Sequence, residues 1–339
     1  MTTEEILMEL CAAPGGSGNE QGAAQKALDL TGFPGGQLDA LGNASVTFGD
    51  LSAQTHLLLE AHIDQIGLIV THIEKKGFVR FAACGGVDAR TLPGNPVTVW
   101  ASGAKEPLMG VIGSVPPHLN KDGTDKVPDI ADMAIDLGLP EEIVREQVHP
   151  GDRVFPFYTP RKLAGTRMTS AALDNRAGVA TLVRCAHLLA KETLHCRITL
   201  LFATREEVGG QGARTGAFAL EPDQAICVDV GFAAQPGVPE AESKPLGSGA
   251  MIGVAPVLDR AMTRRLAALA KQHEIPYTWD VMGNETGTDG DGIAGVRGGV
   301  RTALVSVPER YMHTAAEVVE MQDVEAVAQL LAAYGKELC

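Results

Sequence analysis

Residues 56–70 have the sequence HLLLEAHIDQIGLIV, and the first part of this stretch decides the fold. The run LLLEA is apolar except for one glutamate, and it leads directly into His62, Ile63 and Asp64. A short continuous apolar run bounded by polar residues is typical of a strand that is buried on both faces of a sheet. The stretch therefore predicts a central strand with ionisable side chains at its carboxyl end.

The same pattern, an apolar run followed by ionisable residues, recurs three times further along the chain. The three segments are ITLLFATREEVGG (198–210), QAICVDVG (224–231) and TALVSVPERYMH (302–313). Helical periodicity is found at residues 174–192, 258–274 and 323–338, and a short helix with Thr3 as its N-cap is predicted to open the chain. Strands that alternate with helices predict an α/β protein whose sheet has helices on both faces.

One long segment lacks this alternation. Residues 71–160 contain short alternating runs such as GFVRFAACGG and NPVTVWASG, frequent Gly and Pro, and little helical periodicity outside residues 129–147. These features predict a small β-rich insertion domain at 71–160. The α/β domain is then discontinuous and consists of residues 1–70 and 161–339.

Composition and charge exclude several classes of protein. The 28 basic and 42 acidic residues give a net charge of −14, which repels nucleic acids and anionic membranes. The N-terminal residues lack a secretory signal, and the chain has no apolar stretch long enough to span a membrane. Six cysteines without a paired spacing are expected to be mostly reduced thiols. We therefore expect a cytoplasmic protein with no nucleic-acid or membrane partner.

The predicted strand ends supply the candidate site residues. Each has an ordinary structural explanation when taken alone: Asp174 precedes a long helix, where Asp is a common N-cap, and an acidic pair after a strand is compatible with a solvated loop. Carboxyl ends of strands, however, meet at one edge of an α/β sheet. We therefore predict one shared site at that edge, made of His62 with Asp64 beside it, Asp174, Glu206, Glu207, Asp229 and His313.

These residue types favour metal-dependent hydrolysis. Two histidines with three or four carboxylates form a nitrogen and oxygen donor set that suits zinc, cobalt or manganese. More acidic groups than one ion needs indicate two ions, about 3.5 to 4 Å apart and bridged by one carboxylate. Water held between them would have its pKa lowered toward about 7 and would yield hydroxide. A carboxylate that binds no metal could then act as general base and pass the proton to a leaving amine.

The strings EAHIDQIG, ALDNRAG, ATREEVGGQGA, VDVG, GTDGDGIA and PERYMHTAAEVVE occur in this order. Their combination resembles the tetrahedral aminopeptidase family, which includes glutamyl aminopeptidases and some members labelled endoglucanases. The resemblance covers nearly the whole chain. It implies an α/β/α metallopeptidase domain with a mixed, mostly parallel sheet, interrupted by a small β-barrel-like domain. It also implies peptide substrates that lose their N-terminal residue, and a homo-oligomer that is a hollow dodecamer.

The resemblance further implies a role for each site residue. It assigns His62 and Asp229 to separate metals and Asp174 to a bridge between them. Glu207 and His313 would be the remaining ligands, Glu206 the general base, and Asp64 the residue that orients His62. After VDVG the chain continues as FAAQPGVPEAE, where relatives often have a further acidic residue, so the preferred N-terminal residue is not implied.

Three other functions fit parts of the sequence. A dinucleotide-binding oxidoreductase is suggested by Gly210, Gly212 and Gly216 after a strand, although the two preceding glutamates would repel a pyrophosphate. A carbohydrate hydrolase could use Glu206 with Asp174 or Asp229, but His62 and His313 would then have no function in the reaction. A catalytically inactive, metal-stabilised assembly protein is the third.

Three lone residues outside these strings are singled out as well. Ser17 and Ser248 lack the GxSxG setting of a serine nucleophile. His118 could line a pocket or an oligomer contact.

Overall fold

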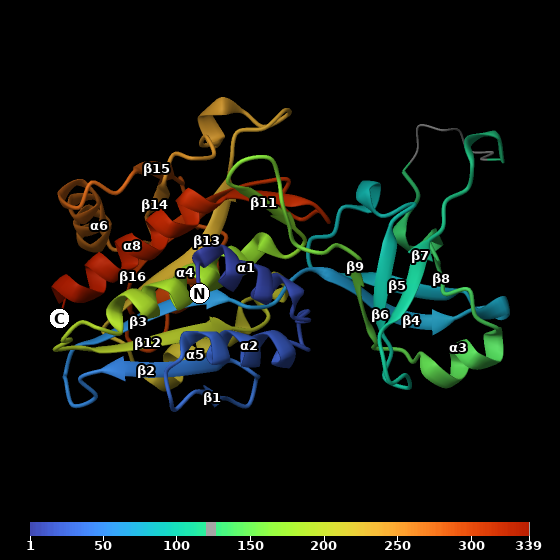
Figure 1. Cartoon of the computed structure of the whole chain (residues 1–339), viewed down its shortest axis with the longest axis horizontal. Coiled ribbons are helices and arrows are strands. Elements are labelled where there is room, and N and C mark those ends of the chain that lie inside the picture. The colour runs from blue at the N-terminus through green and yellow to red at the C-terminus, as the bar shows by residue number, and fades with distance from the viewer. Residues whose placement is uncertain (120–126, 339) are drawn as a thin grey trace. The chain divides into compact units, whose positions relative to one another are not determined.

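The computed structural model describes residues 1–119 and 127–338, which form two compact units. The first unit comprises Met1–Asp64, Pro160–Met312 and the chain from Ala316 onward. The second comprises Gln65–Thr159 together with His313–Ala315. Figure 1 shows the elements of both units along the chain.

The first unit is built on a mixed sheet, which has 11 strands among the described residues. Its strands are β1 (Gln37–Leu38), β2 (Ala44–Gly49), β3 (His56–His62), β10 (Arg161–Lys162), β11 (Arg167–Ser170), β12 (Arg197–Ala203), β13 (Gln224–Phe232), β14 (Ala250–Val254), β15 (Tyr277–Val281), β16 (Arg301–Arg310) and β17 (Glu317–Glu320). The four predicted strands are β3, β12, β13 and β16. They pair in parallel in the spatial order β12-β3-β13-β16, which brings their carboxyl ends to one edge.

Helices cover both faces of this sheet. The helices are α1 (Thr3–Ala12), α2 (Gln21–Thr31), α4 (Leu173–Leu189), α5 (Gln211–Leu220), α6 (Arg260–Gln272), α7 (Asp289–Ala294) and α8 (Met321–Leu338). Side chains alternate between two cores along each strand: Leu57 and Leu59 of β3 belong to the larger core, and Leu58 to the smaller one. The larger core lies under α1, α2, α4, α6 and α8, and the smaller one under α5 and α7. Figure 1 shows α1, α4 and α8 on the same face.

The second unit is a closed barrel around its own hydrophobic core. Its strands pair in the order β4-β5-β8-β7-β6-β9, and each pair is antiparallel. They are β4 (Gly67–Ile73), β5 (Val79–Cys84), β6 (Pro96–Trp100), β7 (Leu108–Ile112), β8 (Ile135–Asp136) and β9 (Arg153–Pro156), with the helix α3 (Glu141–Gln147) between β8 and β9. The predicted fold class, an α/β domain with a barrel-like insertion, is therefore confirmed.

Local details differ from the sequence predictions. The N-cap of α1 is Thr2 rather than Thr3, and its side chain accepts from the backbone N–H of Glu5 in a capping box. The stretch 129–147 is helical only in the seven-residue helix α3 and in a 3-10 turn at Ile130–Asp132, and it also contains the strand β8. Cys11, Cys84, Cys185 and Cys227 are free thiols, which agrees with the expectation that most of the cysteines are reduced, whereas Cys196 is disulfide-bonded.

Within the described part of the chain, no helix combines the length and the apolar character that crossing a bilayer requires.

Core leucines of β12 are expected to set the stability of the first unit. Leu200 is fully buried in the larger core, whereas Leu51 is 65% exposed on a turn. Because it leaves a cavity, Leu200→Ala should lower the free energy of unfolding by about 2 to 5 kcal/mol. Leu51→Ala should change it by no more than about 0.5 kcal/mol. Urea denaturation followed by circular dichroism measures both, and equal losses would contradict this assignment of the core.

Candidate metal centre

Several of the predicted site residues lie where the central parallel strands end. β3 and β12 remain paired up to His62 and Ala203. The pairing of β3 with β13 stops earlier, at Glu60 and Cys227, so Asp229 lies two residues beyond the last pair. Asn175 of α4 donates to the carbonyl of Val228, the first residue past that pair, at 2.7 Å. The first turn of α4 is thereby fixed beside the ends of the strands.

His62 lies at the centre of the site and is only 2% exposed. Its Nε2 atom is 3.2 Å from Asp174 Oδ1 and 3.6 Å from Asp229 Oδ1. On the other side of the ring, Nδ1 lies 3.2 Å from the backbone carbonyl of Asp64 and 3.5 Å from its carboxylate. A carbonyl can only accept a hydrogen bond, so Nδ1 is the donor on this side of the ring, and Nε2 faces the carboxylates.

The carboxylates strongly influence the charge of His62. Burial lowers the pKa of the ring, but the contacts with Asp174, Asp229 and Asp64 outweigh burial and raise the pKa well above its usual value. Protonation is one way to balance so many buried negative charges, and a divalent cation at Nε2 is another.

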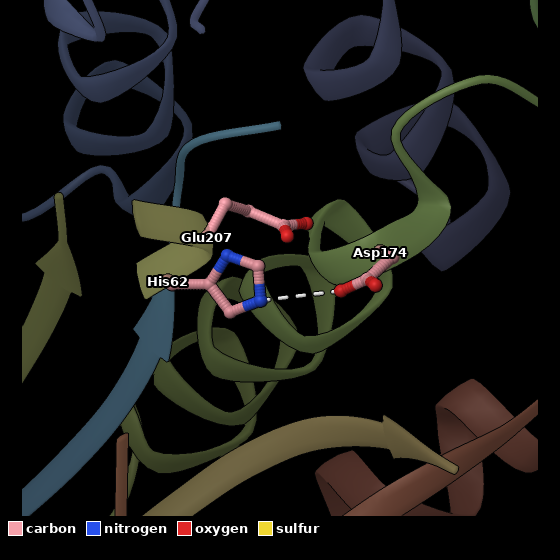
Figure 2. A group of neighbouring side chains, drawn as sticks. All are labelled: His62, Asp174 and Glu207. Atoms are coloured by element: carbon pink, nitrogen blue, oxygen red, sulfur yellow. Dashed lines mark ion pairs between the residues drawn. The ribbon is translucent and has the colours of Figure 1, made fainter. Parts of the chain in front are cut away.

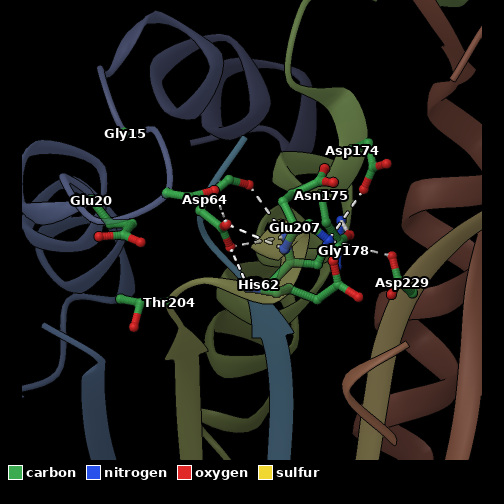
Figure 3. Close-up of polar contacts among 12 residues, drawn as sticks. Gly15, Glu20, His62, Asp64, Asp174, Asn175, Gly178, Thr204, Glu207 and Asp229 are labelled. Atoms are coloured by element: carbon green, nitrogen blue, oxygen red, sulfur yellow. Dashed lines mark hydrogen bonds and ion pairs between the residues drawn. The ribbon is translucent and has the colours of Figure 1, made fainter. Parts of the chain in front are cut away.

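Asp64 is fully buried and connects His62 to the acidic turn that follows β12. Its Oδ1 accepts the backbone N–H of Glu206 at 3.0 Å, and its Oδ2 accepts that of Glu207 at 3.3 Å. Burial would raise the pKa of Asp64, but the contact with His62 outweighs it and the pKa is lowered. Figure 3 shows Asp64 between His62 and the segment that contains Glu207.

Glu206 and Glu207 form the 3-10 turn η5 (Glu206–Val208). Arg205, Gly209 and Gly210 all have positive φ angles, of 62°, 128° and 69°. Glycine adopts such angles without strain, as the sequence predicted for this turn. Burial raises the pKa of Glu206 to about 8, and the nearby carboxylates of Asp229, Asp289 and Asp174 contribute to the increase.

Asp174 is not the N-cap of α4, so the ordinary explanation for it was wrong. Asp174 and Asn175 have non-helical backbone angles, and it is Asn175 that caps the regular part of α4, because its Oδ1 accepts the N–H of Gly178 at 3.0 Å. The backbone N–H of Asp174 donates to Glu317 Oε2 at 3.2 Å, and the Asp174 carboxylate faces His62. Asp229 is 7% exposed. The Oδ1 atom of Asp229 accepts the backbone N–H of Val230 at 2.8 Å.

Among the described residues, one group has the geometry of a metal site. His62, Asp174 and Glu207 each offer a ligand atom, and these atoms lie within 4.8 Å of one another. Figure 2 shows the three side chains converging from β3, α4 and η5. Imidazole nitrogen and carboxylate oxygen are suitable ligands for divalent zinc, cobalt or manganese. The close approach of buried carboxylates to Nε2 also favours a bound cation. Both the type of the ligand atoms and their negative charge therefore suit a divalent metal ion.

Two of the singled-out histidines belong to the second unit. His313 has a positive φ of 63°, and a Cβ at Gly86 would lie 2.6 Å from its Nδ1 atom, so the residues are packed closely. Its role as a metal ligand stays a prediction. His118 is exposed in a 3-10 turn, Pro117–Leu119.

Several buried residues around the site were not assigned from the sequence. Ser17 donates to Asp64 Oδ2 at 2.6 Å. Glu60 lies close to Asp289, and burial together with Asp289 raises the pKa of Glu60 well above its usual value. Glu60, Asn175, Asp289 and Glu317 all lie inside the quoted motif strings, which was the available signal. Ser17 lies in GGSG, which by itself resembles an ordinary turn.

A family model and a curated relative both identify this chain as similar to aminopeptidases. The family model described as M42 glutamyl aminopeptidase matches residues 42–330. The lysyl aminopeptidase of Pyrococcus furiosus is 30% identical over all of this chain and 98% of its own length.

Solved structures agree with the family match. An aminopeptidase from Desulfurococcus kamchatkensis superposes with a TM-score of 0.92 and 31% identity, covering 99% of this chain and 94% of the other. The TET1 peptidase of Pyrococcus horikoshii has a TM-score of 0.88 at 29% identity, with 99% and 100% covered. That peptidase can assemble into a tetrahedron or a large octahedral shell. The chain therefore belongs to the M42 glutamyl aminopeptidase family.

Proposed function

We propose that this M42 aminopeptidase removes single N-terminal residues from peptides with the help of two divalent cations and a glutamate base. The observation on which the proposal rests is the convergence of His62, Asp174 and Glu207 to within 4.8 Å, from three elements far apart in the chain. Asp229 adds a carboxylate 3.6 Å from the same ring nitrogen. This is more anionic donor capacity than one ion needs, which supports a two-ion site.

In the proposed site, Asp174 would be shared by the two cations, His62 and Asp229 would each hold one of them, and Glu207 and His313 would be the other ligands. When bound, zinc, cobalt or manganese would act as Lewis acids and lower the pKa of water toward about 7. The position of Asp174 supports its role as a ligand, because its Oδ1 lies 3.2 Å from Nε2 of His62. Asp64 holds Nδ1 of His62 from the other side and so fixes the tautomer that can bind a cation.

Glu206 would move the proton in this reaction. Its carboxylate takes a proton from the attacking water and gives it to the nitrogen of the departing peptide. Two observations support this role. Glu206 directly precedes the ligand Glu207, and its backbone N–H is fixed by Asp64 at 3.0 Å, which restricts the direction of its side chain.

Chelation tests the metal requirement and the reaction class together. Purified protein assayed on a panel of aminoacyl-p-nitroanilides and short peptides should lose its activity after treatment with EDTA. Zinc, cobalt or manganese should restore it, because the reaction needs water of lowered pKa. A soluble cellulose derivative serves as the control substrate. Peptide cleavage that survives EDTA, or cleavage of the polysaccharide instead, would contradict the proposal and favour the carbohydrate hydrolase.

Glu206→Gln should separate catalysis from metal binding. Because the amide cannot accept the proton, kcat should fall by roughly 10² to 10⁴-fold. Metal content, measured by inductively coupled plasma mass spectrometry, should stay at the wild-type level. Glu207→Gln should lower both kcat and metal content. Glu106→Gln, at an exposed position, should change neither kcat nor metal content. Full activity in Glu206→Gln would rule out the base, and a wild-type protein that binds metal but cleaves no peptide would favour the inactive assembly protein.

We also propose that the chain forms a homo-oligomer, a dodecamer, and that residues 71–160 are a domain of their own. The TET1 peptidase, whose structural match covers 99% of this chain, assembles into large shells, and this supports the proposed homo-oligomer. The separate hydrophobic core of the second unit supports the proposal that residues 71–160 are a domain. Sedimentation velocity should give a single species of twelve chains. A monomer or dimer at micromolar concentration would contradict the dodecamer.

A further inference from the structure

The loop between α1 and α2 passes directly beside the site. Its residues 13–20 have the sequence APGGSGNE, and Ser17 near its middle is 3% exposed. The Ser17 hydroxyl donates to Asp64 Oδ2 at 2.6 Å, a short bond to a charged acceptor. This contact joins residues 47 positions apart in the chain. The loop is therefore in direct contact with a residue of the site.

Arg176 holds this loop in place from the opposite side. Its guanidinium group is fully buried, and it donates to the carbonyls of Leu10 at 2.9 Å, Ala13 at 3.3 Å and Gly15 at 3.2 Å. A Cβ at Gly15 would lie 2.6 Å from its Nη2 atom, so only glycine allows this approach. Because Arg176 is two residues after Asp174 on α4, the loop is anchored to the element that supplies a proposed metal ligand.

Asp64 is the meeting point of these contacts. Its Oδ2 receives both the Ser17 hydroxyl and the Glu207 N–H, and its Oδ1 receives the Glu206 N–H. A carboxylate with these three donors has one orientation that satisfies them all. Removing the hydroxyl deletes the shortest of the three bonds and allows the carboxylate to rotate about its last torsion.

We propose that Ser17 is a positioning residue of the aminopeptidase site, acting through Asp64. Its hydroxyl fixes the Asp64 carboxylate, which in turn fixes the His62 ring and the backbone of the Glu206–Glu207 turn. No role as a nucleophile is proposed for Ser17, whose side chain is buried and whose hydroxyl is hydrogen-bonded to Asp64. This inference rests on the proposed function for its kinetic consequence, and on the metal site alone for its effect on binding.

The test compares Ser17→Ala with a matched loss of a buried hydroxyl. Thr31 is 2% exposed at the far end of α2, and its hydroxyl donates to the carbonyl of Leu28 at 2.7 Å. Zinc affinity of EDTA-stripped protein is measured by competition with a chromogenic chelator, and kcat and KM on the best p-nitroanilide. Ser17→Ala should weaken zinc binding and lower kcat by roughly 10- to 100-fold each, with KM changed less than about threefold. Thr31→Ala should leave all three near wild type at a similar thermal midpoint.

A double-mutant cycle shows whether Ser17 acts through Asp64. In the Asp64→Ala background, Ser17→Ala should have no further effect on zinc affinity, because the group it positions is gone. Equal losses in both backgrounds, or a Ser17→Ala variant indistinguishable from Thr31→Ala, would overturn the inference. Ser17→Cys, which offers a weaker hydrogen-bond donor of similar shape, should cause an intermediate loss of zinc affinity and kcat. This variant replaces Ser17→Ala in the test if Ser17→Ala does not fold.

The two hypotheses fail separately in this experiment. A wild-type protein that cleaves no peptide would end the proposed function, whereas the zinc-affinity cycle would still decide the role of Ser17.

Discussion

The burial of several carboxylates around one imidazole ring is the constraint on which the rest of the site depends. Removing a charge from water costs several kcal/mol unless hydrogen bonds or opposite charges compensate for it. Asp64 meets this requirement with two backbone N–H groups and the Ser17 hydroxyl. Asp174 and Asp229 instead face the imidazole of His62. The surrounding structure holds these acids together despite their mutual repulsion, as a cation-binding site must.

The parallel sheet makes this convergence possible. His62, Glu206 and Asp229 are far apart in the chain, but β3, β12 and β13 are neighbours that run in the same direction. Where β3 and β13 cease to pair, Asn175 satisfies the carbonyl of Val228 and brings the first turn of α4, with Asp174, against the strand ends. Backbone hydrogen bonding thus determines where the reactive side chains meet.

The central strands and the edge where they end could be predicted because continuous apolar runs and strand direction are visible in sequence. LLLEA and ITLLFA are short continuous apolar runs, which are typical of strands buried on both faces of a sheet. The Ser17 contact could not be predicted, because it depends on how a glycine-rich loop folds back over 47 residues. Asp174 was open to interpretation as a helix cap, but the side chain that accepts a helical N–H is that of Asn175, and the Asp174 carboxylate faces His62. The roles of Glu206, Glu207 and His313 rest on family resemblance, since adjacent or distant residues of the same type look alike in sequence.

The anchoring of the N-terminal loop by Arg176 changes how the boundaries of the catalytic part should be drawn. The family model begins at residue 42, whereas the carbonyls that receive the Arg176 guanidinium lie at Leu10, Ala13 and Gly15. A shortened protein that starts at the family boundary would keep every proposed ligand and yet leave a guanidinium charge buried with these three acceptors missing. The first helix and the loop after it are thus an integral part of the catalytic fold.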